Sequence, residues 1–246
     1  EQGQWKGKIV RAELYELQHA DLGRKYAEKD RRSLDPPPVV ALRLSEITPM
    51  GQWAFQENEI LDYSNVEIIG VLCAAELIPV IESRSSGQLL PTSRTSTVHS
   101  HSNPYSDGDC RMPTEVRDLS SGGNARIPSS EIARLTANVL VGSKVVQPHL
   151  VELDGEKRLV FVFSDLAVKN LGLFRLRYKC FDLVSAVPGT DAKIQAECTG
   201  GNFRIFSTKE FPGLQVSTNL TKILSAQGVS LNIRNSERRH KRRKVS

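Results

Sequence analysis

The sequence contains the run Leu159-Val160-Phe161-Val162-Phe163, and this stretch decides the fold class. Consecutive aliphatic, β-branched and aromatic residues predict a strand that is buried on both faces. The pair Asp154-Gly155 lies just before the run, between apolar residues, and is typical of a β-hairpin turn. A buried strand that is entered from a hairpin indicates a β-sheet protein.

Strand patterns continue on both sides of this run. Segments rich in β-branched and aliphatic residues, or with apolar residues at alternate positions, predict strands at Ile9–Leu17, Val39–Leu44, Val66–Val80, Leu171–Val184 and Ala192–Cys198. Arg175, Arg177 and Lys179 alternate along one of them, so we expect them on the solvent side of a half-buried sheet. Many strands without alternating helices favour an all-β sandwich of the immunoglobulin or Rel-homology kind.

One or two short helices are compatible with this pattern, and one is predicted between Thr218 and Gln227. Ser217 is the expected N-cap, and Gly228 is the expected C-terminal stop. Three residues form an apolar stripe at helical spacing, which indicates packing against the core: Leu220, Ile223 and Leu224.

Two segments interrupt the strands. The loop Ala20–Pro38 ends in three prolines, which lack amide donors and predict a stiff connector rather than an interior strand. Residues 82–128 are rich in Ser, Thr, Gly, Asn and Pro and predict a long disordered insertion. His99 and His101 in this insertion have no Cys or carboxylate neighbours, so we expect no metal site. The predicted domain spans residues 8–234, ordered over 8–81 and 129–234, and a basic tail follows over 235–246.

Several classes of protein are disfavoured by composition and motifs. No apolar run approaches the roughly 18 residues that a membrane span requires. Cys73, Cys180 and Cys198 lie in strand-like apolar contexts and, with Cys110, form no C-x-x-C pair, which favours buried free thiols over disulfides. We find no nucleophile elbow, phosphate-binding loop, dinucleotide fingerprint or zinc-protease motif. We therefore expect no enzyme, no cofactor and no small-molecule substrate.

The net charge is concentrated at one end of the chain. The 246 residues carry a formal charge of +5, and residues 237–244 alone contain six Lys or Arg and one Glu. The rest of the chain is therefore close to neutral, and a DNA-binding surface would have to come from local clusters of cations.

One such cluster lies in the loop between Asp21 and Arg32. Its three acids are Asp21, Glu28 and Asp30, and its five cations are Arg24, Lys25, Lys29, Arg31 and Arg32. Lys and Arg bind phosphates, and the planar Arg side chain reads guanine edges, so this loop is the candidate for contact with double-stranded DNA. The alternative is a solvated loop in which the acids neutralise their neighbours.

The C-terminal tail is the second cationic cluster and contains Arg238, Arg239, Lys241, Arg242, Arg243 and Lys244. A run of this kind is typical of a nuclear localisation signal or of an unspecific phosphate-binding segment. The alternative is a tail that only increases solubility.

Three groups of residues together carry a family resemblance. They are Glu28-Lys29-Asp30-Arg31-Arg32-Ser33-Leu34-Asp35-Pro36-Pro37-Pro38, then Phe161-Val162-Phe163-Ser164-Asp165-Leu166-Ala167-Val168, then Phe211-Pro212-Gly213-Leu214 with Ser217-Thr218, Leu220 and Gln227-Gly228. In this order, with a variable insertion between the ordered halves, the chain resembles the velvet domain of fungal developmental regulators.

The resemblance implies a Rel-homology-like sandwich that dimerises with itself or with other velvet proteins. It also implies action in the nucleus, with possible shuttling to the cytoplasm, and control of sporulation and secondary metabolism. In family members a Pro follows the Gln residues of the loop after the first strand, whereas here Gln18 is followed by His19 and Ala20. An adaptor subunit whose partner contacts the DNA is therefore the alternative function. A secreted immunoglobulin-like adhesion module is a further alternative, which fits the basic tail poorly.

Overall fold

The computed structural model describes residues 4–5, 7–51, 54–80, 138–184, 192–236 and 238–239. The predicted insertion 82–128, with His99, His101 and Cys110, lies outside the described residues, as do residues 240–246 of the tail. Within the described part no helix is long and apolar enough to cross a membrane.

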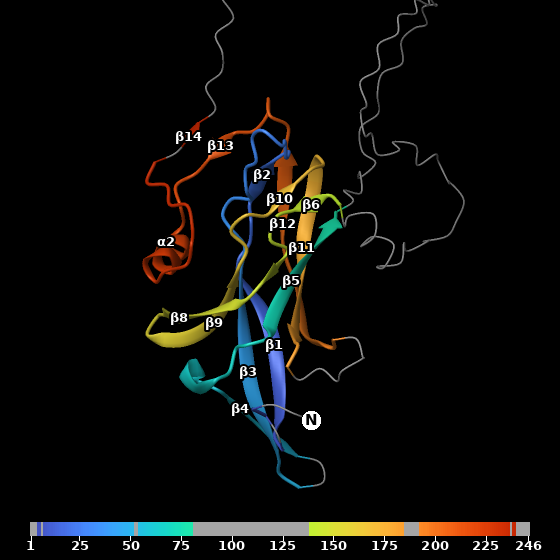
Figure 1. Ribbon diagram of the computed structural model, residues 1–246, viewed down its shortest axis with the longest axis vertical. Coiled ribbons are helices and arrows are strands. Elements are labelled where there is room, and N and C mark those ends of the chain that lie inside the picture. The colour runs from blue at the N-terminus through green and yellow to red at the C-terminus, as the bar shows by residue number, and fades with distance from the viewer. Residues whose placement is uncertain are drawn as a thin grey trace, which may run out of the picture. The chain divides into compact units, whose positions relative to one another are not determined.

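Two five-stranded sheets form a sandwich, as the sequence predicts (Figure 1). The first sheet has the order β1-β3-β9-β8, and β4 pairs with the distal half of β3. Its strands are β1 (Ile9–Gln18), β3 (Val39–Pro49), β4 (Phe55–Glu59), β8 (Pro148–Leu153) and β9 (Glu156–Val162). The predicted Asp154-Gly155 turn joins β8 to β9, and both of its residues have positive φ.

The second sheet has the order β2-β12-β11-β5-β7, in which β2 runs parallel to β12 and the other pairs are antiparallel. Its strands are β2 (Leu22–Arg24), β5 (Val71–Pro79), β7 (Val145–Val146), β11 (Gly172–Asp182) and β12 (Ile194–Phe206). Two short pairs complete the described strands: β6 (Leu140–Val141) with β10 (Ala167–Val168), and β13 (Gly213–Leu214) with β14 (Arg238–Arg239).

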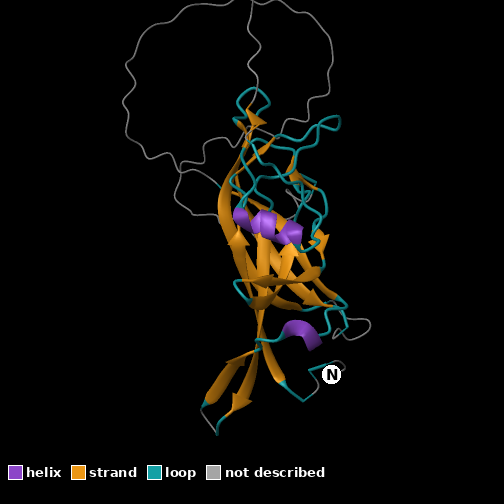
Figure 2. Cartoon of the chain, turned by 90° about the vertical axis from the view of Figure 1, so that its left-hand side faces the viewer, coloured by secondary structure: helices purple, strands orange, loops and turns teal. Residues whose placement is uncertain are grey.

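Around β9 the first sheet is buried on both faces. Leu159 and Phe161 of β9 belong to the main core between the sheets, whereas Val160 and Val162 pack on the opposite side with Leu224. That opposite side is covered by α2 (Asn219–Ala226), which lies across the strands in Figure 2. The double burial expected for residues 159–163 is confirmed, since none of the five is more than 5% exposed.

The predicted helix exists, but its N-cap is Thr218 rather than Ser217. The Thr218 hydroxyl accepts a hydrogen bond from the Thr221 amide at 3.1 Å. Ser217 instead accepts a hydrogen bond from the Arg234 amide through its hydroxyl at 2.9 Å. Two adjacent hydroxyl residues precede this helix, and the sequence pattern could not show which one had another partner.

The predicted strand pattern needs correction at several places, among them the end of the predicted strand Ala192–Cys198, since β12 continues to Phe206. The loop 20–38 contains the short strand β2, because its backbone follows the end of β12. Residues 66–70 form an irregular segment that ends in a turn before β5, and Gly70 has a positive φ of 82°. Strand β4 was missed because all five of its residues are exposed and show no apolar alternation.

A half-buried carboxylate joins the two sheets. Glu16 on β1 accepts a hydrogen bond from the Tyr178 hydroxyl at 2.8 Å and another from the Gly201 amide at 2.7 Å. The β11–β12 register shifts at this place, where Gly200 and Gly201 form a bulge. A Cβ atom at Gly200 would collide with the Glu16 carboxylate, so the glycine makes room for the contact.

The alternating cations of β11 do share one face, as predicted, but they are half-buried. Arg177 and Lys179 donate to the same carboxylate, that of Glu76 on β5, at 2.7 and 2.6 Å. Burial alone would raise the pKa of the Glu76 carboxyl, but these hydrogen bonds and charges hold the pKa below its usual value.

The predicted free thiols are confirmed for the three cysteines that the structure describes. Cys73 and Cys180 are buried and lie opposite each other on β5 and β11. Burial raises the pKa of the Cys180 thiol to about 12 and that of Cys198 to about 11. These thiols are therefore protonated at neutral pH and pack as small apolar groups.

Candidate nucleic-acid interface

The loop between β2 and β3 is fastened to the end of the sandwich by backbone hydrogen bonds. The Lys25 amide donates to the Phe206 carbonyl at 2.9 Å, and the Tyr26 amide donates to the Val168 carbonyl at 2.8 Å. Further along, the Leu34 amide donates to the Leu166 carbonyl at 2.7 Å. The predicted cation loop is thus an ordered structure lying beside β10 and the last residues of β12.

Arg24 is a buried residue that stabilises the loop. Its side chain is only 6% exposed, and its guanidinium forms an ion pair with Asp30. Asp30 also accepts a hydrogen bond from Arg32 at 3.3 Å. The hydrogen bond from Arg24 is the main reason why the pKa of the Asp30 carboxyl lies below its usual value. Arg24 therefore shapes the loop and does not present its charge to solvent.

Arg31 is held by the turn that follows β9. Its Nη2 donates to the Asp165 carbonyl at 2.7 Å and to the Asp165 carboxylate at 2.9 Å. The same carboxylate accepts a hydrogen bond from the Ser143 amide at 2.8 Å, so Asp165 has a structural role. Gly142 has a φ of 111°, and a Cβ atom there would collide with both the Asp165 carbonyl and the Arg31 guanidinium.

The far end of the loop is fixed by a buried ion pair. Asp35 accepts hydrogen bonds from the Arg234 guanidinium and, at 3.3 Å, from the Gln215 amide. The backbone of Asp35 also exchanges hydrogen bonds with Leu22, next to Arg24 on β2. Burial raises the pKa of the Asp35 carboxyl, and the positive charge of Arg234 opposes that rise.

The prolines that follow form the predicted connector and lie outside the strands. Gln18, at the end of β1, donates to the Pro37 carbonyl at 2.7 Å and to the Thr221 hydroxyl of α2 at 3.1 Å. The connector is therefore attached both to the first sheet and to the helix that covers it.

Two predicted cations project freely from this framework. Lys25 and Lys29 are exposed, and neither forms an ion pair with any residue that the structure describes. Arg31 and Arg32 are paired but keep side-chain exposures of 41% and 38%. Lys25, Lys29, Arg31 and Arg32, all at one end of the sandwich, are called the loop cations below.

A further cation at this end lies outside both predicted cation clusters. Lys169 is exposed and follows Val168, whose carbonyl accepts the amide of Tyr26. Lys169 stands alone in its own segment, so only the fold brings it beside the loop. The structure describes only two of the predicted tail cations, Arg238 and Arg239, whose backbone pairs with β13. The other predicted tail cations lie outside the described residues.

The three quoted stretches meet around this loop. Arg31 and Asp35 belong to the first stretch, Asp165 belongs to the second, and Gln215 follows Leu214 of the third. A family model described as Velvet factor matches residues 12–238. The chain belongs to the velvet family.

Two relatives in this family match nearly the whole chain. A protein from Laccaria bicolor, named "Probable velvet family sexual development regulator", is 44% identical over 98% of this chain and 75% of its own length. A protein of the same description from Schizophyllum commune is 43% identical over 99% of this chain and 80% of its own length. A velvet complex subunit from Mycosarcoma maydis is 30% identical over 67% of this chain and 34% of its own length.

Proposed function

We propose that this velvet protein is a DNA-binding regulator of transcription that acts in the nucleus as a homodimer or with other velvet proteins. Relatives named as regulators of sexual development, and of development and secondary metabolism, support a role in these processes. Control of sporulation is part of the same proposal. The observation that carries the proposal is the presentation of the loop cations at one end of the sandwich by an ordered loop.

The loop has the properties that groove binding requires. Its backbone is held at Lys25, Tyr26 and Leu34, so few conformations are lost when it meets a duplex. Lys25 and Lys29 can neutralise phosphates without breaking an ion pair. Arg31 and Arg32 lie beside them, and each can exchange an exposed carboxylate for a base edge or a phosphate.

A second function is supported by the same ion pairs. Arg24, Arg31 and Arg32 are already neutralised by Asp30 and Asp165, which lowers the net charge of the loop. Some relatives are named as velvet complex subunits. An adaptor that joins such a complex, with most DNA contacts made by its partner, would need only this weaker surface.

Selection from a pool of random duplexes near physiological salt separates the two functions. The proteins compared are the wild type, Arg31→Ala/Arg32→Ala, a chain truncated after Ser236, and the control Arg158→Ala, whose ion pair with Glu156 lies at the β8–β9 hairpin. Direct DNA reading predicts an enriched sequence that is lost only in the double variant. Unselective binding that disappears with the tail would contradict direct reading by the loop and support the adaptor.

A further inference from the structure

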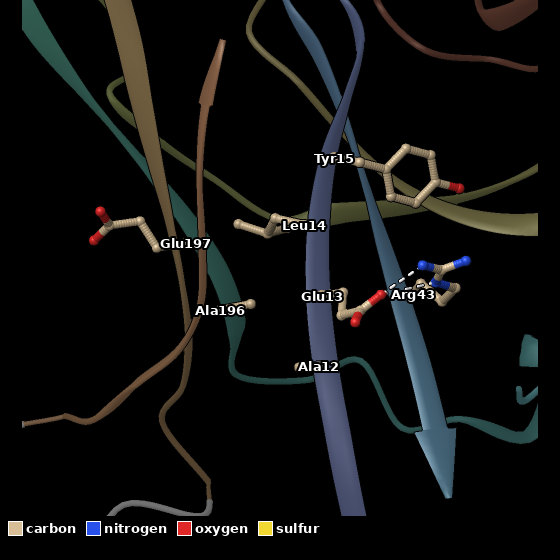
Figure 3. Close-up of a pocket in the computed structure, with 7 residues that line it drawn as sticks. All are labelled: Ala12, Glu13, Leu14, Tyr15, Arg43, Ala196 and Glu197. Carbon is tan, nitrogen blue, oxygen red and sulfur yellow. Dashed lines mark hydrogen bonds and ion pairs between the residues drawn. The ribbon is translucent and has the colours of Figure 1, made fainter. Parts of the chain in front are cut away.

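The sandwich has two neighbouring strand edges that, over most of their length, pair with no described strand. Among the described strands β1 pairs only with β3, and the second side of β12 pairs only with β2, over Arg204–Phe206, while its Gly201 amide is bound by Glu16 of β1. Between these edges lies an open hollow of about 460 Å³, whose lining includes Ala12 of β1 and Ala196 of β12 (Figure 3). A free edge exposes backbone N–H and C=O groups that can pair with another strand.

β1 is well suited to accept such a strand. Ile9 to Glu16 pair with β3 in unbroken register, and the first irregularity comes between Glu16 and Gln18. In this stretch the odd-numbered side chains lie on the outer face of the sheet, and the even-numbered ones, such as Leu14, face the core.

A second copy of β1 fits this edge in one register. A two-fold axis perpendicular to the sheet pairs outer-face side chains of one copy with outer-face side chains of the other. Opposite residues are then both odd-numbered or both even-numbered, so the axis passes beside one residue, which lies opposite its own copy. With the axis at Ala12, Arg11 lies opposite Glu13 of the second copy, and Glu13 lies opposite Arg11. The same register places Ile9 opposite Tyr15, an apolar residue opposite an aromatic one.

The adjacent registers are unfavourable. Moving the axis to Arg11 places two arginines directly opposite each other, and moving it to Glu13 places two glutamates directly opposite each other. Like charges in directly opposite positions destabilise a strand pair. The sequence of β1 is thus self-complementary about Ala12 alone among these three registers.

The ion pairs within each chain extend the charge complementarity between the two copies of β1. Arg11 is bound to Glu57 at 2.8 Å, and Glu13 is bound to Arg43 at 2.5 Å, as Figure 3 shows for the second pair. All four side chains are exposed. Pairing Arg11 with Glu13 of the second copy therefore joins two existing pairs into one row of alternating charge, from Glu57 of one chain to Arg43 of the other.

From this complementarity we propose that two copies of the chain associate through β1, antiparallel and centred on Ala12, which makes the first sheets of both copies continuous. The proposal rests on the dimerisation included in the proposed function, and it names the surface. The open edge of β12, which begins at Ile194, lies on the same side of the sandwich and would face its counterpart in the second copy.

Charge reversal tests this register. Light scattering after size-exclusion chromatography, with sedimentation to obtain Kd, is applied to the wild type, Arg11→Glu, Glu13→Arg and the double variant. Each single reversal places like charges opposite each other twice in the dimer, so we expect Kd to rise about fivefold or more. The double variant restores opposite charges and returns Kd toward the wild-type value. Thermal unfolding of each monomer checks that the fold is kept.

Cross-linking provides a second readout that leaves the charges unchanged. Residues opposite each other in an antiparallel pair have Cα atoms about 4.5–5.5 Å apart, within the range of a disulfide. Ala12→Cys should therefore form an intermolecular disulfide under mild oxidation, whereas Glu156→Cys, an exposed control on β9, should not.

The outcomes separate this proposal from the proposed function. A homodimer that both single reversals leave intact, and that Ala12→Cys does not cross-link, would overturn the β1 interface while dimerisation itself stands. A chain that stays monomeric alone would overturn the β1 interface as well. If it also fails to associate with other velvet proteins, the dimerisation in the proposed function is contradicted too, and DNA binding remains to be judged by the duplex selection.

Discussion

Arg234 donates to the carboxylate of Asp35 from 199 residues further along the chain. The two side chains are only 15% and 7% exposed, so this ion pair is buried. It attaches the segment that leads into the basic tail to the end of the cation loop. The cation loop and the segment before the basic tail are therefore connected by this one ion pair.

Replacing Arg234 with Gln should lower the free energy of unfolding by about 3 kcal/mol, because it leaves Asp35 as a buried charge without its partner. Urea denaturation at pH 7 measures the loss. Burial raises the pKa of Asp35, so the destabilisation should be greatest at neutral pH and should shrink as pH falls and the carboxyl takes up a proton. Lys8→Gln, which breaks an exposed pair with Glu46, is the control and should leave the unfolding midpoint unchanged. Equal losses in the two variants would contradict the argument.

Glu76 should stabilise the folded protein when it is ionised, whereas the pKa of Asp35 is raised by burial. Its pKa in the folded protein is depressed below the ordinary value of 4.5, so its contribution is present above about that pH and is lost as pH falls through the folded pKa. Glu76→Gln should therefore be less stable than the wild type at pH 6, and the two unfolding curves should converge toward pH 3. A gap that is constant over this range would mean that the charge of Glu76 is not responsible.

Gly200→Ala tests the bulge that receives Glu16. The added Cβ would collide with a carboxylate already bound by Tyr178 and Gly201, and overpacking of this kind costs about 2 kcal/mol. The matched control is Thr199→Ala, an exposed neighbour on β12. Thermal unfolding should show a clear loss of Tm for the first variant and little change for the second.

Gly142→Ala should disturb the loop cations without touching them. Its Cβ would displace Arg31 and the Asp165 carbonyl, and the positive φ of Gly142 adds strain to any other residue. We expect weaker binding to the selected duplex together with a modest loss of stability. Gly155→Ala also replaces a glycine of positive φ, but nothing lies within 4 Å of the added atom, so it controls for strain alone. If both variants bind DNA like the wild type, the contacts that hold Arg31 against Asp165 are not required for DNA binding.

Much of the fold could be predicted because local patterns carry it. The buried run at residues 159–163, the Asp154-Gly155 turn and the helix before Gly228 are each encoded in a few consecutive residues. Strand β4 could not be predicted, because a strand exposed on both faces leaves no apolar alternation.

The candidate site was predictable only as a cluster of charge. The sequence indicates which residues are cations, but their roles depend on partners far along the chain. Arg31 reaches Asp165, and Lys169 joins the loop only through the contact between Tyr26 and Val168. Separations of this length leave no local signal. Arg24 pairs with Asp30 only six residues away, but its burial on β2, which pairs with β12, has no signal in the sequence of the loop.

The salt dependence of DNA binding tests the central claim most directly. Each phosphate contact contributes about −0.9 to the slope of log Kobs against log salt concentration. Lys25→Gln/Lys29→Gln should therefore make the slope less steep by about 1.8, whereas Lys193→Gln, an exposed lysine just before the opposite end of β12, should leave it unchanged. Equal slopes for the wild type and the double variant would show that Lys25 and Lys29 contact no phosphate, which would contradict the claim that the loop cations bind DNA together.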